Sequence, residues 1–274
     1  MKNYLLSLKE MTKDIFGNLR RIAALAYFEY KLGTKDMFLG GLWKILSPFI
    51  QIGAYWFVFG IGLRNGAPID GISYVVWLTC GVTAWSWLSG CINQTAGSIY
   101  RKAAMLTRSN IPTCLIPLSS VLAKTLDNGW TIALMLMIYF ANGCMPTSTA
   151  WGLLYYLFCG LIFLSVCSLI TSALVMLARD FQKVLQAVMR LMFFLSPIFW
   201  RPSYSLPEAF RLFDFCNPFG YVIRGFRNCL LYNTSILSAW RNGIAFWMIV
   251  AILYLIGSAF QSKMRKDLLD YLEW

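Results

Sequence analysis

An uninterrupted run of 51 uncharged residues, at positions 128–178, constrains this chain more than any other feature. A helix that crosses the hydrocarbon core of a bilayer needs about 20 apolar residues, so the run is long enough for two crossings. Only three charges, Arg179, Asp180 and Lys183, then separate it from the next apolar segment. Such a short turn cannot be a domain, and it must lie at a membrane surface where another protein can contact it.

The composition supports a membrane location. Of the 274 residues, 58% are hydrophobic and only 13% are charged, against about 25% charged residues in soluble domains. The net charge of +12 indicates contact with anionic lipid at the cytoplasmic face rather than nucleic-acid binding. Histidine is absent, which removes the usual general base and the commonest metal ligand. We therefore expect no metal site and no catalytic site in this chain.

The pattern predicts an all-α integral membrane protein with six transmembrane helices. Residues 1–44 carry eight basic side chains, and Leu19, Ile22, Ala26 and Tyr30 recur at helical spacing, as in an amphipathic helix at the membrane interface. Residues 45–262 form the transmembrane domain, and residues 263–274 form a cytoplasmic tail. The six spans are expected at about residues 45–63, 72–97, 118–141, 151–178, 184–200 and 242–262.

The last external loop, residues 201–241, contains apolar pieces at 210–215 and 219–232 that are too short to span a bilayer. We interpret them as short re-entrant helices, which a membrane tolerates where protein covers their ends. With both termini in the cytoplasm, internal segments hold 16 Lys and Arg residues and external loops hold six, as the positive-inside rule requires. Five external arginines oppose this trend and suggest an anionic neighbour outside, either lipid or substrate: Arg201, Arg211, Arg224, Arg227 and Arg241.

Charges within spans are candidates for function. Lys124 and Asp127 lie one helical turn apart, which fits either a structural ion pair or a role in gating or substrate contact. Arg190 has no carboxylate partner on its own helix, and an arginine at the bilayer centre costs roughly 2.5–3.5 kcal/mol. It either extends to the cytoplasmic surface or contacts an anion in a pathway. The candidates for gate or anion contact are Arg20, Arg21, Lys44, Lys124, Asp127 and Arg190.

Aromatic residues cluster in the first and fifth spans. They fit an interfacial belt or packing against lipid, and they equally fit the lining of a conduit, since aromatic faces stack on sugar rings. The candidate conduit residues are Tyr55, Trp56, Phe59, Phe193, Phe194, Phe199 and Trp200. The chain contains no Gly-x-x-x-x-Gly-Lys-Ser/Thr motif, so it does not hold ATP phosphates in a P-loop and any energy must come from elsewhere.

Four motifs together resemble a known family. They are Leu-Gly-Gly-Leu-Trp-Lys-Ile-Leu-Ser-Pro at 39–48, Tyr-Trp-Phe-Val-Phe-Gly at 55–60, Ala-Arg-Asp-Phe at 178–181, and Asn217-Pro218 followed by Arg227-Asn228. In this order they resemble the six-span permease subunits of ABC exporters for teichoic acid and lipid-linked polysaccharide, over nearly the whole chain. Residues 55–60 and 72–87 look most like the wall teichoic acid branch. Arg224 departs from the pattern, because relatives often have a neutral or acidic residue there.

The resemblance implies a homodimer of this chain with two copies of a separate ATP-binding subunit, which would hold ATP and Mg. The complex would move an undecaprenyl-diphosphate-linked anionic polymer from the inner to the outer face of the bacterial cytoplasmic membrane. Its conduit would lie at the dimer interface between spans 1 and 5, and the N-terminal helix would form a gate. The external element would include Asn217, Pro218 and Arg227; the coupling residues would be Ser98, Arg101, Lys102, Arg108, Arg179, Asp180, Phe181 and Lys183.

Other functions stay open at this point. Within the same family, the substrate is alternatively an O-antigen or a capsular polysaccharide. A membrane-embedded transferase acting on lipid-linked sugars is a different class, but it needs acidic or histidine catalysts, and the chain offers no suitably spaced Asp/Glu pair and no histidine. A channel or scaffold is a third class, for which the sequence shows no ring of charges.

Overall fold

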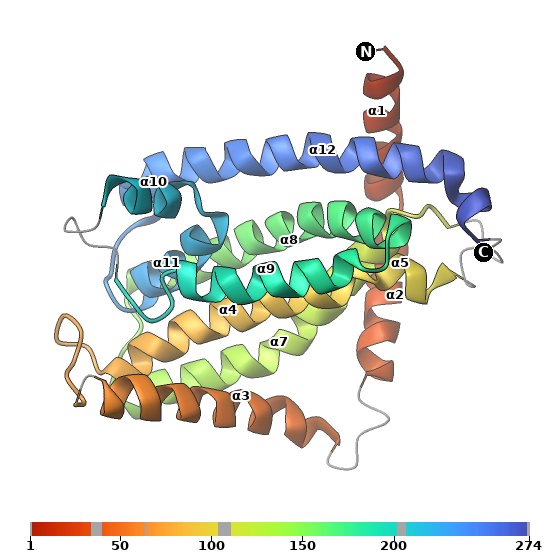
Figure 1. Cartoon of the computed structure of the whole chain (residues 1–274). Helices are drawn as coiled ribbons and strands as arrows, with labels where there is room; N and C mark the ends of the chain where they lie inside the picture. Colours follow the sequence, from red (N-terminus) through yellow and green to blue (C-terminus); the bar gives the residue numbers. More distant parts are fainter. Residues whose placement is uncertain (1, 34–39, 64, 104–110, 202–206, 273–274) are drawn as a thin grey trace.

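A computed structural model describes residues 2–33, 40–63, 65–103, 111–201 and 207–272 (Figure 1). Every named secondary-structure element within these ranges is a helix. The only β-pairing among the described residues is an isolated bridge between Ile69 and Ile72. The predicted all-α membrane fold is therefore confirmed.

Five helices of the described chain are long and apolar enough to cross a membrane. They coincide with five of the six predicted spans and run side by side in Figure 1. They are α3 (Trp43–Tyr55) continued by η2 (Trp56–Gly62), α4 (Tyr74–Ala96), α7 (Leu115–Ala141), η3 (Ser148–Trp151) continued by α8 (Gly152–Leu177), and η4 (Ile236–Ala239) continued by α12 (Trp240–Leu272).

The remaining predicted span is a shorter helix. α9 (Phe181–Leu195) has 15 residues, which at 1.5 Å per residue extend about 22 Å, less than the ~30 Å hydrocarbon core. It ends because Pro197 disfavours helical backbone at Ser196, whose ψ of 151° is extended. The helix therefore ends before Trp200, the predicted end of this span, and a sixth crossing stays a prediction.

The two ends of the bundle differ. One end carries α2 (Leu19–Leu32), α5 (Ser98–Arg101) and the turn at 178–180, and we call it the hairpin end (Figure 1). The opposite end, which we call the loop end, carries the connection between η2 and α4, and the predicted short helices of the last loop, α10 (Glu208–Cys216) and α11 (Pro218–Leu230).

The N-terminal region forms two helices rather than one. α1 (Lys2–Gly17) and α2 are separated at Asn18 and run across the direction of the bundle (Figure 1). Ile22 and Ala26 are buried where α2 packs on α7, while Arg20 and Arg21 are exposed. The predicted apolar stripe is thus confirmed for its central residues, and the arginines lie off it.

The core is organised around α4, the most buried of the candidate spans. Its Trp87 is fully buried, and the indole N–H donates to the hydroxyl of Thr125 on α7 at 3.1 Å. The indole lies so close to Gly160 of α8 that a Cβ there would approach the ring to 2.5 Å. Close packing at small residues and interhelical hydrogen bonds are the interactions that hold helices together in lipid.

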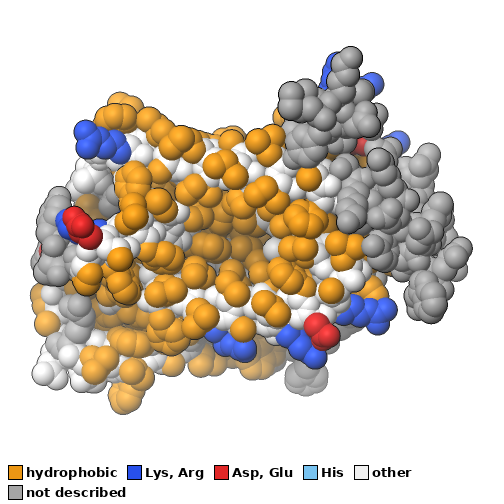
Figure 2. Space-filling model, turned by 45° about the horizontal axis from the view of Figure 1, so that its top comes forward, with side chains coloured by type: hydrophobic (Ala, Val, Ile, Leu, Met, Phe, Trp, Pro, Cys, Tyr) orange, Lys and Arg blue, Asp and Glu red, His pale blue; other side chains and the backbone are white. Residues whose placement is uncertain are grey.

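The outer surface fits a bilayer. In Figure 2 a broad band of hydrophobic side chains covers the middle of the visible face, which is hollowed at its centre. The exposed hydrophobic side chains include Phe158 of α8 and Met248 and Ile252 of α12. A band of this kind on several long helices is expected where lipid, rather than water, surrounds the protein.

Candidate functional site

An open groove runs between α3 and α9, with α4 as its floor. We call it the α3–α9 groove, and its volume is about 630 Å³. It contains four of the predicted functional residues, namely Tyr55, Arg190, Phe193 and Phe194. Its lining residues are Gln51, Tyr55, Trp85, Ser86, Ser89, Asn93, Gln186, Met189, Arg190, Phe193 and Phe194.

The two predicted aromatic clusters meet at this groove. The ring of Phe193 lies 5.6 Å from that of Tyr55 and 5.7 Å from that of Trp85, centroid to centroid. Phe199 extends the cluster, at 5.3 Å from Tyr55 and stacked at 4.2 Å on Phe59. Rings from the first and fifth predicted spans therefore build one continuous wall.

Two of the predicted conduit aromatics lie elsewhere. Trp56 packs its ring over Gly60, where a Cβ would come within 2.8 Å of it. Trp200 donates its indole N–H to the carbonyl of Phe194 at 3.1 Å, and its ring lies 6.2 Å from that of Phe210. Neither side chain lines the α3–α9 groove.

The Tyr-Trp-Phe-Val-Phe-Gly motif adopts an unusual backbone. Residues Trp56–Gly62 form a π-helix, η2, which continues α3 towards the loop end. π-Helical turns are rare and occur frequently at functional sites. Here the wider turn lies directly after Tyr55, at the aromatic end of the groove.

The other end of the groove is polar. Ser86, Ser89 and Asn93 follow one face of α4 at helical spacing, towards the hairpin end. The Asn93 Oδ1 atom is buried and accepts no hydrogen bond from the residues that the structure describes. Arg190 is exposed in the groove and forms no ion pair with any described carboxylate. Our sequence interpretation missed this polar face, although its 3.6-residue period was visible in the uncharged segment.

A cluster of charges lies on the opposite side of α3. The Nζ atom of Lys44 is 2.5 Å from Asp127 Oδ1, and that of Lys124 is 2.9 Å from Asp127 Oδ2. Lys44 also lies 4.1 Å from the ring centroid of Tyr30, whose hydroxyl accepts the Trp130 indole N–H at 3.3 Å. The Lys124–Asp127 ion pair thus exists, and Lys44 from α3 and Tyr30 from α2 join it.

The two predicted coupling segments lie side by side at the hairpin end. The guanidinium of Arg179 is 4.3 Å from the ring centroid of Tyr100 in α5. Asp180 and Lys183 pair at 3.3 Å with side chains 91% and 84% exposed. Arg101, Arg179, Asp180 and Lys183 are exposed. We call this group the docking surface, because the resemblance noted in the sequence predicts that an ATPase subunit binds there.

Other residues of the predicted coupling set do not face outward. Ser98 is fully buried, so it is not part of that surface, and Phe181 is half-buried against the core. Lys102 points inward. Arg108 lies outside the residues that the structure describes.

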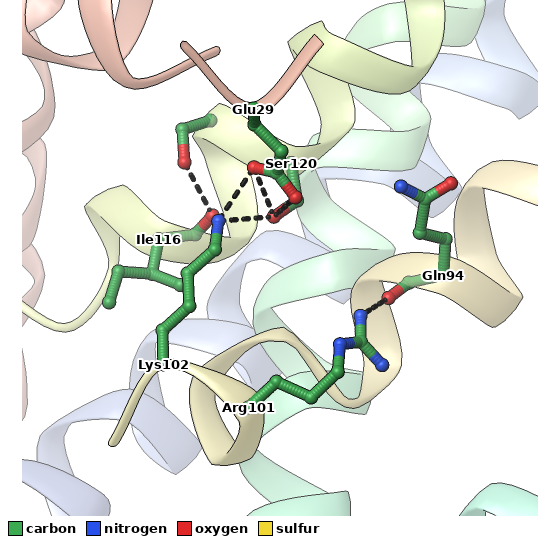
Figure 3. A network of polar contacts seen from close by, with 7 residues as sticks. Glu29, Gln94, Arg101, Lys102, Ile116 and Ser120 are labelled. Atoms are coloured by element: carbon green, nitrogen blue, oxygen red, sulfur yellow. Dashed lines mark hydrogen bonds and ion pairs between the residues drawn. The ribbon is translucent and has the colours of Figure 1, made fainter. Parts of the chain in front are cut away.

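Lys102 forms a polar network that joins three helices (Figure 3). Its ammonium lies 2.6 Å from the carboxylate of Glu29 in α2 and donates to the hydroxyl of Ser120 in α7 at 3.2 Å. The Ser120 hydroxyl in turn lies 3.0 Å from both Glu29 carboxylate oxygens. The adjacent Arg101 donates to the backbone carbonyl of Gln94 in α4 (Figure 3). The sequence gives no local sign of Glu29's role, because its partners are 73 and 91 residues away.

The Asn217–Pro218 element begins α11. The Asn217 side chain accepts the backbone N–H of Phe219 at 3.0 Å, and Pro218 occupies the first turn, where no N–H is needed. The Asn217 amide also donates to Ser196 at 3.2 Å, just after α9. These contacts are structural and fix where the loop helix starts.

Arg227 of α11 is buried, with 3% of its surface exposed. It donates to the backbone carbonyls of Trp77 at 3.1 Å, Pro197 at 2.5 Å and Ile198 at 2.7 Å, and its guanidinium carbon lies 3.3 Å from the Trp77 ring centroid. It thereby ties α11 to α4 and to the segment after α9. These partners are backbone carbonyls and an indole ring, and the external anion stays a prediction for Arg227.

Three more external arginines pair with carboxylates of this chain. Arg201 binds Asp70 at 2.5 Å, and Arg211 lies 3.8 Å from Glu208. Arg224 pairs with Asp214, whose carboxyl pKa is raised by burial, against the lowering effect of the arginine. The fifth, Arg241, lies 5.5 Å from the ring centroid of Trp240. Three of the five arginines predicted to be external are therefore neutralised by carboxylates of this chain.

Comparison with known proteins agrees with this arrangement. The chain matches the ABC-2 type transporter family over residues 20–231, a range that includes every residue lining the α3–α9 groove. It is 27% identical over 230 residues to the O-antigen export system permease protein RfbA of Klebsiella pneumoniae, covering 84% of this chain and 83% of that protein. A protein of the same name from Myxococcus xanthus is 24% identical over 204 residues, covering 73% and 76%. The match spans most of the chain, and this protein therefore belongs to the ABC-2 type transporter family.

Proposed function

We propose that this chain is the transmembrane subunit of an ATP-driven exporter that moves a polymer linked to undecaprenyl diphosphate from the inner to the outer face of a bacterial cytoplasmic membrane. The observation that carries the proposal is the α3–α9 groove. Its hairpin-end half offers Arg190, Asn93 and Gln186 to a polar or anionic group, and its loop-end half offers rings such as Trp85 and Phe193 to sugars.

The favoured polymer is a polysaccharide. The relatives from Klebsiella pneumoniae and Myxococcus xanthus carry the name O-antigen export system permease protein, which supports the polysaccharide alternative rather than the wall teichoic acid branch. No residue of the groove argues specifically for a poly(polyol phosphate), since its lining contains a single cation, Arg190. The proposed cargo is therefore an O-antigen-like glycan rather than wall teichoic acid.

The proposed complex contains two ATP-binding subunits and a second copy of this chain. Membership of the ABC-2 family implies an ATP-binding partner, and the docking surface at the hairpin end is where we place it. In the most apolar stretch of α3 and η2, only 11% of the residues are buried within the chain. In α9, Leu191 and Phe194 are exposed. A second copy that covers these apolar faces would close the α3–α9 groove into a conduit. With this arrangement both termini lie in the cytoplasm.

The transferase alternative has little support. None of the residues that line the groove is a carboxylate, so the groove offers no general acid or base pair. A transporter needs no such pair, since the ATPase supplies the energy.

Co-purification from a native membrane tests the proposal. The tagged chain is expected to bring an ATPase subunit with it, and charge reversal with Arg179→Glu and Asp180→Arg is expected to release that subunit. The matched control is Arg241→Glu, which places the same change at the loop end. A chain that purifies without any ATPase, or a complex that survives the reversal of Arg101, Arg179 and Asp180 together, would contradict the proposal.

A further inference from the structure

We propose that a second groove, between α3 and α7, binds the phosphate head group of an anionic amphiphile. Its volume of about 580 Å³ lies within the roughly 300–1,000 Å³ of small-molecule sites. The groove lies across α3 from the α3–α9 groove, and Ser86 lines both. Its lining residues are Trp43, Lys44, Ser47, Pro48, Ser86, Lys124, Asp127, Asn128 and Thr131.

The charges of this groove do not balance. Lys44 and Lys124 both contact Asp127, which is the single acidic residue among the lining, so the cluster carries a net charge of +1. The side chains of Lys44 and Lys124 are 10% and 28% exposed. An excess positive charge at this depth in a low-dielectric surrounding is stabilised by an anion. Each ammonium has three N–H donors, and Asp127 occupies one on each, so donors remain for that anion.

An unpaired amide points to the same ligand. Asn128 lines the groove and is 6% exposed, and its Nδ2 donor has no hydrogen-bond partner among the residues that the structure describes. Buried donors without acceptors are rare in proteins, and a ligand is one common reason for them. Two ammonium groups and an amide donor around one space match the several acceptor oxygens of a phosphate.

The walls fit a ligand that also has an apolar tail. Trp43 and Pro48 form the apolar part of the groove, and Trp43 is 42% exposed. Leu126 and Trp130, on the same turns of α7, are 52% and 41% exposed. Two sources offer such chemistry, a membrane phospholipid and the diphosphate of a lipid-linked substrate. The inference needs only that the chain lies in a membrane, so it stands apart from the proposed export function.

Native mass spectrometry of the intact purified complex tests the site. Phosphatidylglycerol is expected to bind at least tenfold more tightly than uncharged diacylglycerol. The double variant Lys44→Gln/Lys124→Gln should lose this preference, and Asn128→Leu should weaken it several-fold. The matched control, Lys13→Gln, removes an exposed lysine of α1 that lines neither groove and should bind like the wild type.

The Asp127→Asn variant shows whether the Lys44, Lys124 and Asp127 cluster binds a ligand or has only a structural role. It raises the net charge of the groove to +2, so phosphatidylglycerol should bind as tightly as before or more tightly, whereas a structural role for the cluster predicts loss. Competition with a polyprenyl diphosphate identifies the source: displacement assigns the site to the lipid carrier, and no displacement assigns it to membrane phospholipid. Equal binding of charged and uncharged lipids, unchanged binding by the double lysine variant, or loss in Asp127→Asn would overturn the proposal.

Discussion

Arg227 and Arg190 show how differently two arginines of this chain are used. Arg227 is buried and its three donor groups are directed at backbone carbonyls, so it acts as a clamp between α11, α4 and the segment after α9. Arg190 is exposed in the α3–α9 groove without a described ion-pair partner. Sequence alone could not separate these roles, because both residues are cations in largely apolar stretches. Their surroundings come from segments that are far away in the chain.

The clamp predicts a large effect on stability. Arg227→Met removes a donor from three carbonyls. That of Trp77 lies inside α4 and keeps its helical partner, whereas those of Pro197 and Ile198 lose the donor that Arg227 provides. Because each such buried group costs about 1–3 kcal/mol, we expect a loss of ~2 kcal/mol or more. Arg227→Lys should recover little, because an ammonium on a flexible stem does not reproduce the planar fork of a guanidinium. Thermal unfolding of the purified protein measures both, with Arg241→Gln as the control. An Arg227→Met protein that melts like the wild type would refute the clamp.

The aromatic wall predicts a selective effect on export. Tyr55→Ala or Phe193→Ala should lower the export rate roughly tenfold, which corresponds to about 1.4 kcal/mol of lost contact with the polymer. Phe158→Ala is the control, because Phe158 is 54% exposed on α8 and lines neither groove. Surface polysaccharide on cells that express each variant at equal level provides the measurement. Equal damage from all three substitutions would argue that the aromatics only support the fold.

At the scale of helices, the long uncharged segments predicted most of the fold. The spans at α3, α4, α7, α8 and α12 follow from length and hydropathy, as do the two short helices of the last loop. One difference has a local cause, because Pro197 stops α9 before the predicted end of its span. The predicted cytoplasmic tail at 263–274 continues α12 as far as Leu272, and its place in the cytoplasm stays a prediction. The aromatic part of the α3–α9 groove was also predictable, because Tyr55, Phe193 and Phe194 were among the predicted conduit residues. The polar face of α4 and the partners of Lys44 and Glu29 depend on how helices pack, which periodicity within one helix does not reveal.

We predict that the Glu29–Lys102 ion pair carries movement at the docking surface to helix α2. It joins α2 to the segment after α5, and its side chains are 21% and 27% exposed. Glu29→Gln or Lys102→Gln should lower the polymer exported per ATP hydrolysed several-fold while hydrolysis itself continues. The exchanged pair Glu29→Lys/Lys102→Glu should restore part of this ratio, because it re-forms the attraction. A ratio that is unchanged in both single variants would show that α2 moves independently of α5.

At the scale of the whole molecule, the proposed function assigns three tasks to three levels of the helix bundle. The docking surface lies at the hairpin end, the α3–α9 groove lies along the middle of the bundle, and Arg227 joins α11 to α4 and to the segment after α9 at the loop end. In the proposed complex, the short turn between α8 and α9 would transmit a push at Arg179–Lys183 into the helix that carries Arg190 and Phe193. This geometry is why the groove, rather than the lipid-facing surface, is the proposed path.

The most direct test captures the cargo in that path. A photo-reactive amino acid replaces Phe193 in the groove or, as the control, Phe158, which is 54% exposed on α8 and lines neither groove. After illumination of exporting cells, carbohydrate should be attached to the chain at position 193, should disappear when the ATPase subunit is inactivated, and should be absent at position 158. Equal capture at both positions, or none at position 193 while export continues, would contradict the account.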